Sequence, residues 1–184
     1  MKHTDIEHEV RLWLEQVVIG LNLCPFASKP YLQNQVRIVI SDCEEPTCLL
    51  TQLAEELQFL DKHEPQQLET TLLVLPQMLE NFYDYNAFLD MADALLEQLG
   101  WTGFYQIASF HPHYQFSGTQ PEDAENLTNC SPYPILHLIR EASIEKVLKH
   151  YPNPTAIPQR NIDTVCNLTK TQIRQLFPHL NSSD

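Results

Sequence analysis

Residues 109–116 read Ser109-Phe-His-Pro-His-Tyr-Gln-Phe116, and here the chain passes from regular structure into a polar loop. They close an apolar run, residues 104–110, whose aromatic and β-branched side chains are typical of a strand. The loop that follows extends to residue 130, and loops of about twenty residues in compact domains tend to be functional or disordered. Polar groups able to do chemistry are densest here, so this stretch predicts a site.

Outward from this stretch, short apolar runs alternate with longer runs whose apolar residues recur at helical spacing. The predicted strands are 36–40, 70–75 and 104–110, and the predicted helices are 5–20, 45–61, 82–99 and 133–149, with two shorter helices after residue 154. Helical crossovers join parallel strands. We therefore expect a single α/β domain over residues 1–184. Its small, mainly parallel sheet has three strands, or four if residues 28–36 form another, flanked by five to six helices.

The charge of the chain excludes broad classes of partner. Its 184 residues include 24 Asp and Glu against 11 Lys and Arg, a net charge of −13. Nucleic acids and anionic membranes require a basic surface, so neither is an expected partner. No apolar run approaches the length of a membrane-spanning helix. The N-terminus is polar rather than typical of a signal peptide, and the expected location is therefore cytoplasmic. The sequence does not decide the oligomeric state.

Five cysteines, an odd number without an export signal, argue against a disulfide framework. No pair has the Cys-x-x-Cys spacing, so Cys43, Cys48 and Cys166 are expected to be reduced thiols. Cys24 is followed by Pro25 and Phe26, as reactive cysteines of thioredoxin-fold enzymes are. In those enzymes the cysteine follows a strand and opens a helix, whose N-terminus lowers the thiol pKa. Cys24 instead follows a predicted helix, which favours a structural thiol and makes Cys24 a secondary candidate for catalysis.

Three chain segments are expected to meet at one edge of the sheet, because open α/β sheets bind ligands outside the carboxyl ends of their strands. They are residues 41–42, 76–77 and 111–113, and they bring Asp42 close to His111.

A metal site is one interpretation of the side chains at this edge. Proline holds the residue before it extended, and alternate residues of an extended segment point to the same side with Cα atoms roughly 6.5 Å apart. His111 and His113 could therefore chelate one ion. His137 and Glu141 lie four residues apart on the predicted helix, hence on one face. Such nitrogen and oxygen ligands suit zinc, iron or manganese. The alternative is one histidine bonded in the core and one in solvent.

A second interpretation uses the same region without a metal. The planar guanidinium of Arg140 suits a carboxylate or phosphate. The start of the predicted helix, entered through Asn129 and Ser131, would offer free N–H groups to the same small anion. A histidine such as His111 would act as acid or base.

Three segments together resemble the bacterial domain-of-unknown-function family 1415. They are residues 13–27, 107–116 and 129–143, which include Leu-Asn-Leu-Cys-Pro-Phe-Ala, Ser-Phe-His-Pro-His-Tyr-Gln-Phe and Ser-Pro-Tyr-Pro-Ile-Leu-His-Leu-Ile-Arg-Glu. The resemblance spans nearly the whole chain and implies a small bacterial protein of one domain, without an assigned activity or cofactor. In the family pattern the position of Cys130 is usually arginine, and that of His113 is not fixed as histidine. These departures make Cys130 and His113 weaker candidates as ligands than His111, His137, Arg140 and Glu141.

Two classes of function follow from these residues. The first is an enzyme or small-ligand binder, in which His111 is the acid, base or metal ligand, His137 and Glu141 support it, and Arg140 holds an anionic group. Asp42 and Cys24 are its secondary members. The rival is a non-catalytic interaction protein whose rigid loop and acidic surface meet a partner. A site predicts that these side chains converge in a pocket, and an interaction protein predicts that they are dispersed.

Overall fold

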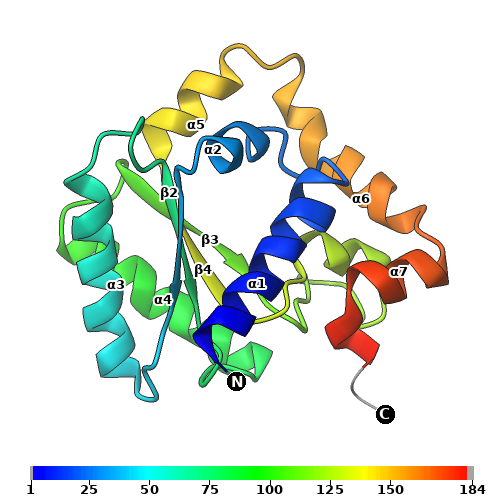
Figure 1. Ribbon diagram of the computed structural model, residues 1–184, viewed down its shortest axis with the longest axis horizontal. Coiled ribbons are helices and arrows are strands. Elements are labelled where there is room, and N and C mark those ends of the chain that lie inside the picture. The colour runs from blue at the N-terminus through cyan, green and yellow to red at the C-terminus, as the bar shows by residue number, and fades with distance from the viewer. Residues whose placement is uncertain (1, 182–184) are drawn as a thin grey trace.

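Four strands form one mixed sheet in the computed structural model, which describes residues 2–181 (Figure 1). The strands are β1 (Val36–Ile40), β2 (Thr70–Val74), β3 (Tyr105–Phe110) and β4 (Ile135–Arg140), in the order β1-β2-β4-β3. β1 and β2 pair in parallel, whereas β4 is antiparallel to both of its neighbours, β2 and β3. The three predicted strands therefore point the same way, and β4 runs against them.

The predicted helix over 133–149 is wrong in its first half, where residues 135–140 form β4 and only Glu141–Leu148 form a helix, α5. The segment Ile-Leu-His-Leu-Ile is apolar at both helical and strand spacing. β4 has a neighbour on each side and a helix layer on each face, and strands buried on both faces lack the polar alternation that identifies a half-exposed strand. The sheet is consequently mixed rather than mainly parallel. Residues 28–36 hide no additional strand, because Ser28–Leu32 form the short helix α2.

The other long predicted helices are confirmed with small shifts of their ends. The α-helices besides α2 and α5 are α1 (His3–Trp13), α3 (Pro46–Asp61), α4 (Phe82–Gln98), α6 (Ile157–Cys166) and α7 (Lys170–Leu176). A π-helical segment, η1 (Leu14–Ile19), continues α1, and three short 3-10 helices are η2 (Ala124–Asn129), η3 (Pro154–Ala156) and η4 (Pro178–Asn181). Within residues 2–181 these helices outnumber the predicted five to six, and none is both long and apolar enough to cross a bilayer.

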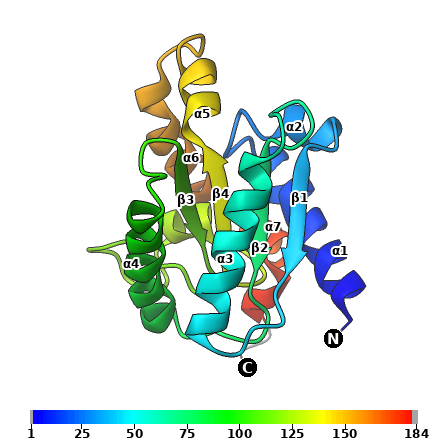
Figure 2. The same ribbon diagram turned by 90° about the vertical axis from the view of Figure 1, so that its left-hand side faces the viewer.

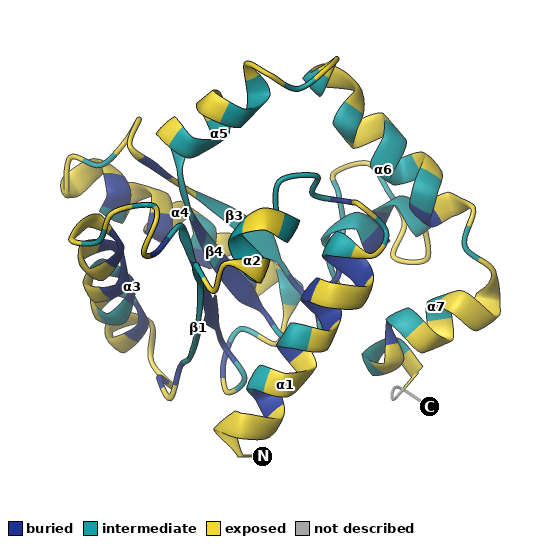
Figure 3. Cartoon of the chain, turned by 45° about the horizontal axis from the view of Figure 1, so that its top comes forward, coloured by how far each residue is buried: buried dark blue, intermediate teal, exposed yellow. Residues whose placement is uncertain are grey.

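Helices cover both faces of the sheet, as Figures 1 and 2 show. Leu73 and Leu136 belong to the core beneath α3 and α4, whereas Leu72 and Ile135 belong to the core beneath α1, α6 and α7. This division follows from the strand period of two, which sends successive side chains to opposite faces. Figure 3 shows the resulting buried stripe along the inner side of each long helix.

Tyr85 on α4 ties the helix layer to the carboxyl ends of the strands. Its side chain is fully buried, and its hydroxyl donates to the carbonyl of Ile135 at 2.7 Å while accepting from the backbone N–H of Phe110 at 3.1 Å. Burial raises the pKa of this phenol, so it stays a neutral donor. One hydroxyl thus connects α4 to the end of β3 and the start of β4.

Replacing Tyr85 by phenylalanine should lower the free energy of unfolding by about 1–3 kcal/mol, because a buried carbonyl and a buried N–H lose their partner. Urea denaturation measures the loss. The matched control is Tyr83→Phe on the same helix, where the side chain is 78 % exposed and the change should stay within about 0.5 kcal/mol. Equal losses in the two variants would contradict this role for the Tyr85 hydroxyl.

Candidate functional site

The carboxyl ends of β1, β2 and β3 lie at one edge of the sheet, as predicted. Ser41, Leu75 and His111 are the residues that follow these strands. Ile135, the first residue of β4, pairs with the last residues of both β2 and β3, Val74 and Phe110. β4 therefore separates the His111 end of the edge from the other two strand ends.

His111 is buried, and both of its ring nitrogens are occupied by the protein itself. Its Nε2 lies 3.0 Å from the carbonyl of Leu79, and its Nδ1 accepts from the backbone N–H of His113 at 3.0 Å. This pattern requires the neutral tautomer with the proton on Nε2. Burial lowers the pKa of His111 to about 4. The imidazole therefore fixes the loop after β3 and offers no free lone pair to a metal.

His137 lies in the middle of β4, and not on a helix, with Leu72 and Ala108 as its cross-strand partners. Its Nε2 lies 2.7 Å from the hydroxyl of Thr70, and burial lowers its pKa to about 4. His113 is exposed, and the centroid of its ring lies 6.1 Å from that of His111. The structure does not bring His111, His113 and His137 together. Over residues 2–181 it contains no group of three His, Cys, Asp or Glu side chains placed to hold a metal ion.

Arg140 ends β4 at the edge opposite to His111, because it pairs with Tyr105, the first residue of β3. Its Nη2 donates to the carbonyls of Leu60, His63 and Leu68, and its Nη1 donates to the Tyr105 hydroxyl at 3.2 Å. Two of these carbonyls follow or end α3, so the guanidinium binds the negative end of that helix.

The predicted convergence of His111, His137, Arg140 and Glu141 is therefore wrong. Glu141 begins α5, and its backbone N–H donates to the carbonyl of Phe104 at the edge away from His111. In a strand, residues 137 and 140 point to opposite faces, whereas a helix would have placed them on one face. The prediction failed because it depended on the period of a helix that is not there.

Asn129 and Ser131 support the loop and do not open a helix. Asn129 donates from Nδ2 to the carbonyl of Ser109 at 3.1 Å, and the buried Ser131 hydroxyl donates to the carbonyl of Tyr133 at 2.6 Å. Asp42 is exposed at the end of β1, where its carboxylate lies 2.7 Å from Nε2 of His3.

Cys24 is half-buried in the turn after η1. Burial raises the pKa of its thiol, so the environment does not activate it. The side chain of Asn161 on α6 donates to the carbonyl of Leu23 at 2.6 Å and fixes the turn. Cys130 is also buried, which raises the pKa of its thiol to about 12.

Cys43 and Cys48 form a disulfide, so the expectation that both are reduced thiols is wrong. Cys43 comes shortly after β1, and Cys48 is the third residue of α3, which Pro46 opens. The turn into the helix brings the two Cα atoms to 5.7 Å, within the range of disulfides. The spacing of Cys43 and Cys48 matches no known cysteine motif such as Cys-x-x-Cys. The signal that could have found the pair is its context, a cysteine after a strand and another in the first turn of the next helix.

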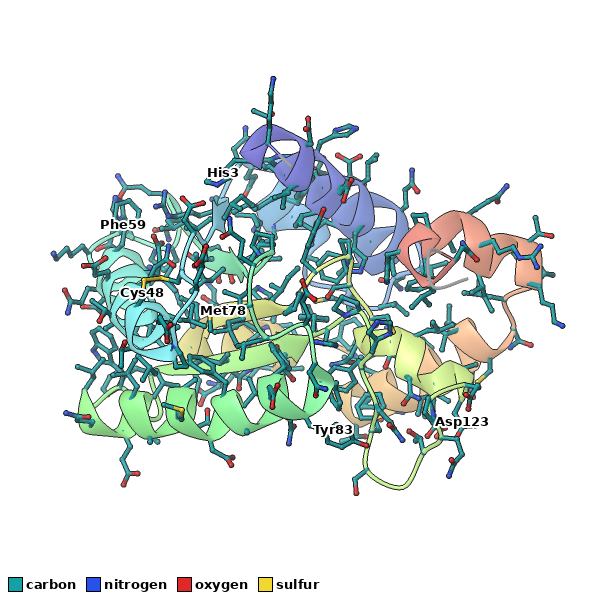
Figure 4. The ribbon with its side chains drawn as sticks, turned by 90° about the horizontal axis from the view of Figure 1, so that it is seen from below. His3, Cys48, Phe59, Met78, Tyr83 and Asp123 are labelled. Carbon is teal, nitrogen blue, oxygen red and sulfur yellow. A yellow bond between two sulfur atoms is a disulfide. The ribbon has the colours of Figure 1, made fainter. Side chains whose placement is uncertain are left out.

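The disulfide borders an open hollow at the carboxyl edge. Cys43 is only 7 % exposed, whereas Cys48 is exposed, and Figure 4 shows the bond beside α3. Oε1 of Gln52 accepts from the Ser41 hydroxyl at 2.6 Å and lies 3.6 Å from Sγ of Cys43. The hollow has a volume of about 460 Å³, and its lining consists of Ile40, Asp42, Cys43, Cys48, Thr51, Gln52 and Glu55.

The model of a family described as a protein of unknown function (DUF1415) matches residues 5–175, nearly the whole chain. No curated protein and no solved structure matches.

Acid should destabilise the fold as the pH falls from about 6.5 to about 4. His111, His137 and His179 have pKa values lowered to about 4 by burial, so the unfolded chain binds their protons first, and stability is full above the ordinary histidine pKa. Urea midpoints across this range measure the loss. His179→Gln should reduce the slope of the unfolding free energy against pH by the equivalent of about one proton, or roughly 1.4 kcal/mol per pH unit. His150→Gln, at an exposed residue, is the control, and an equal change there would contradict the assignment.

Arg140→Met should cost about 2–4 kcal/mol of unfolding free energy, because three carbonyls lose a charged donor. Arg11→Met removes a solvent-exposed ion pair with Glu7 and should cost less than about 1 kcal/mol. Chemical denaturation compares the two. A small loss for Arg140→Met would show that its guanidinium is available for another role.

Proposed function

The chain belongs to the DUF1415 family, whose description assigns no activity, and we propose from the geometry of the sheet edge that it catalyses thiol–disulfide exchange. The observation that supports this function is the Cys43–Cys48 disulfide, with one sulfur exposed at the start of a 16-residue helix beside an open hollow. The site keeps the predicted place of an α/β enzyme, at the carboxyl ends of the strands. It lies at β1 rather than at β3.

Cys48 is the sulfur that a partner can reach. A partner thiolate attacks Sγ of Cys48, the sulfur–sulfur bond breaks, and Cys43 leaves as a thiolate that takes up a proton. A second thiolate of the partner then attacks the partner's own sulfur in the mixed disulfide, and Cys48 leaves. Two electrons and two protons pass from the partner dithiol to the cysteine pair. In the reverse direction the reduced pair converts a partner disulfide to a dithiol.

The surrounding residues give the two sulfurs different roles. Helix N–H groups stabilise a thiolate in the first turn, and no side chain caps the N-terminus of α3. Cys48 therefore suits the attacking position. Cys43 is buried against Gln52, whose Oε1 is placed to accept a hydrogen bond from the reduced thiol. Cys43 is thereby held next to Cys48 and resolves the mixed disulfide from within the protein.

A non-catalytic interaction protein is the second candidate. It is favoured by the dispersal of the predicted His111, Arg140 and Glu141 side chains, which the predicted pocket would have gathered. Redox exchange at Cys48 distinguishes the two candidates, since an interaction protein has no need of a reactive disulfide.

The experiment uses bis(2-hydroxyethyl) disulfide, a neutral probe. Reduced Cys43→Ser should accumulate one mercaptoethanol adduct on Cys48 at neutral pH, because the resolving thiol is gone. Reduced wild type should instead return to the Cys43–Cys48 disulfide, with only Cys24, Cys130 and Cys166 titrating as free thiols after denaturation. Peptide mapping by mass spectrometry locates the adduct.

Cys166 provides the internal control, since it is exposed but ends α6, where no helix N–H group points at its sulfur. The adduct should form on Cys48 at least about tenfold faster than on Cys166, as expected where a helix N-terminus favours the thiolate. An equal or lower rate at Cys48 would overturn the proposed exchange.

A further inference from the structure

The rim of the hollow is acidic, and we propose that the exchange partner is a cysteine flanked by Lys or Arg in a basic peptide segment. This inference rests on the proposed exchange at Cys48. Asp42 and Glu55 line the hollow itself. Glu44 and Glu45 lie between the two cysteines in the chain, immediately before α3.

Most of this negative charge is unbalanced. Among the ion pairs within residues 2–181, Asp42 has His3 as its partner, and Glu44, Glu45 and Glu55 have none. Arg37 is the cation nearest in the chain to Asp42, Glu44 and Glu45, but it already forms an ion pair with Glu56, at 2.9 Å from Nε to Oε2. A partner that brings its own cations would therefore find free carboxylates on both sides of the reactive sulfur.

The acidic rim acts on both the rate and the choice of partner. Charges of one sign around a cleft raise the local concentration of an oppositely charged ligand and repel one of like charge, and salt screens both effects. Thiols that carry a net negative charge are thereby disfavoured. Lys and Arg beside the partner cysteine can reach the rim while the sulfur reaches Cys48.

The test uses two short peptides, Lys-Cys-Lys and Glu-Cys-Glu, each carrying a 2-thiopyridyl group on its cysteine sulfur. Attack by reduced Cys48 forms the peptide mixed disulfide and releases pyridine-2-thione, whose absorbance gives the rate. Cys43 then displaces the peptide thiol and restores the protein disulfide. The Cys48→Ser protein measures the background from the remaining thiols.

At low ionic strength the cationic peptide should react at least about tenfold faster, and the ratio should approach one in about 0.5 M salt. Glu55→Lys should reduce the low-salt ratio several-fold. Glu97→Lys makes the same change of charge at an exposed residue near the end of α4, away from the carboxyl edge, and should leave most of the ratio intact.

The outcomes separate this inference from the proposed function. No release of pyridine-2-thione above the Cys48→Ser background would remove the exchange itself. Equal rates for the two peptides would be consistent with exchange at Cys48 but would overturn the proposed preference for a basic peptide. Equal effects of Glu55→Lys and Glu97→Lys would also overturn it, because the preference would then come from the overall charge of −13 and not from the rim.

Discussion

The insertion of β4 between β2 and β3 is the constraint on which the rest of the structure depends. A central antiparallel strand is covered on both faces, so Leu136 and Leu138 contribute to the core under α3 and α4 while Ile135 contributes to the other core. Its first residue is bonded by Tyr85 at the carboxyl edge, and its last residue, Arg140, binds the end of α3 at the opposite edge. One strand therefore fixes the relation of both helix layers to the sheet.

Burial decides the role of the polar residues that the sequence marks as candidate site residues. His111 and His137 look like catalytic groups in the sequence, but each is held by protein hydrogen bonds and has a pKa lowered to about 4. A neutral imidazole with both nitrogens engaged stabilises a loop, and a guanidinium bonded to several carbonyls stabilises a helix end. Removing such a buried, hydrogen-bonded group lowers the free energy of unfolding, and this stabilising effect is a structural reason for its presence.

The thiol exchange that we propose depends instead on the end of β1. β1 lies at the border of the sheet, and the chain turns from it directly into α3. This turn exposes Cys48 while it buries Cys43, an asymmetry that suits the attacking and resolving roles proposed for the two sulfurs. In the proposed exchange, the carboxylates around the hollow attract a cationic partner and repel an anionic one without any change in the fold.

The sequence by itself determined the helices with strong apolar periodicity, the three strands, their common direction and the family. Each of these depends on local pattern or on the handedness of crossovers. Only the tertiary structure decided that residues 135–140 form a strand, because the spacing of their apolar side chains fits either period until the neighbours of the segment are known. It also decided that His111 and Arg140 lie at opposite edges, and that Cys43 meets Cys48. Distances between side chains follow from strand order and chain reversal, which no local pattern encodes.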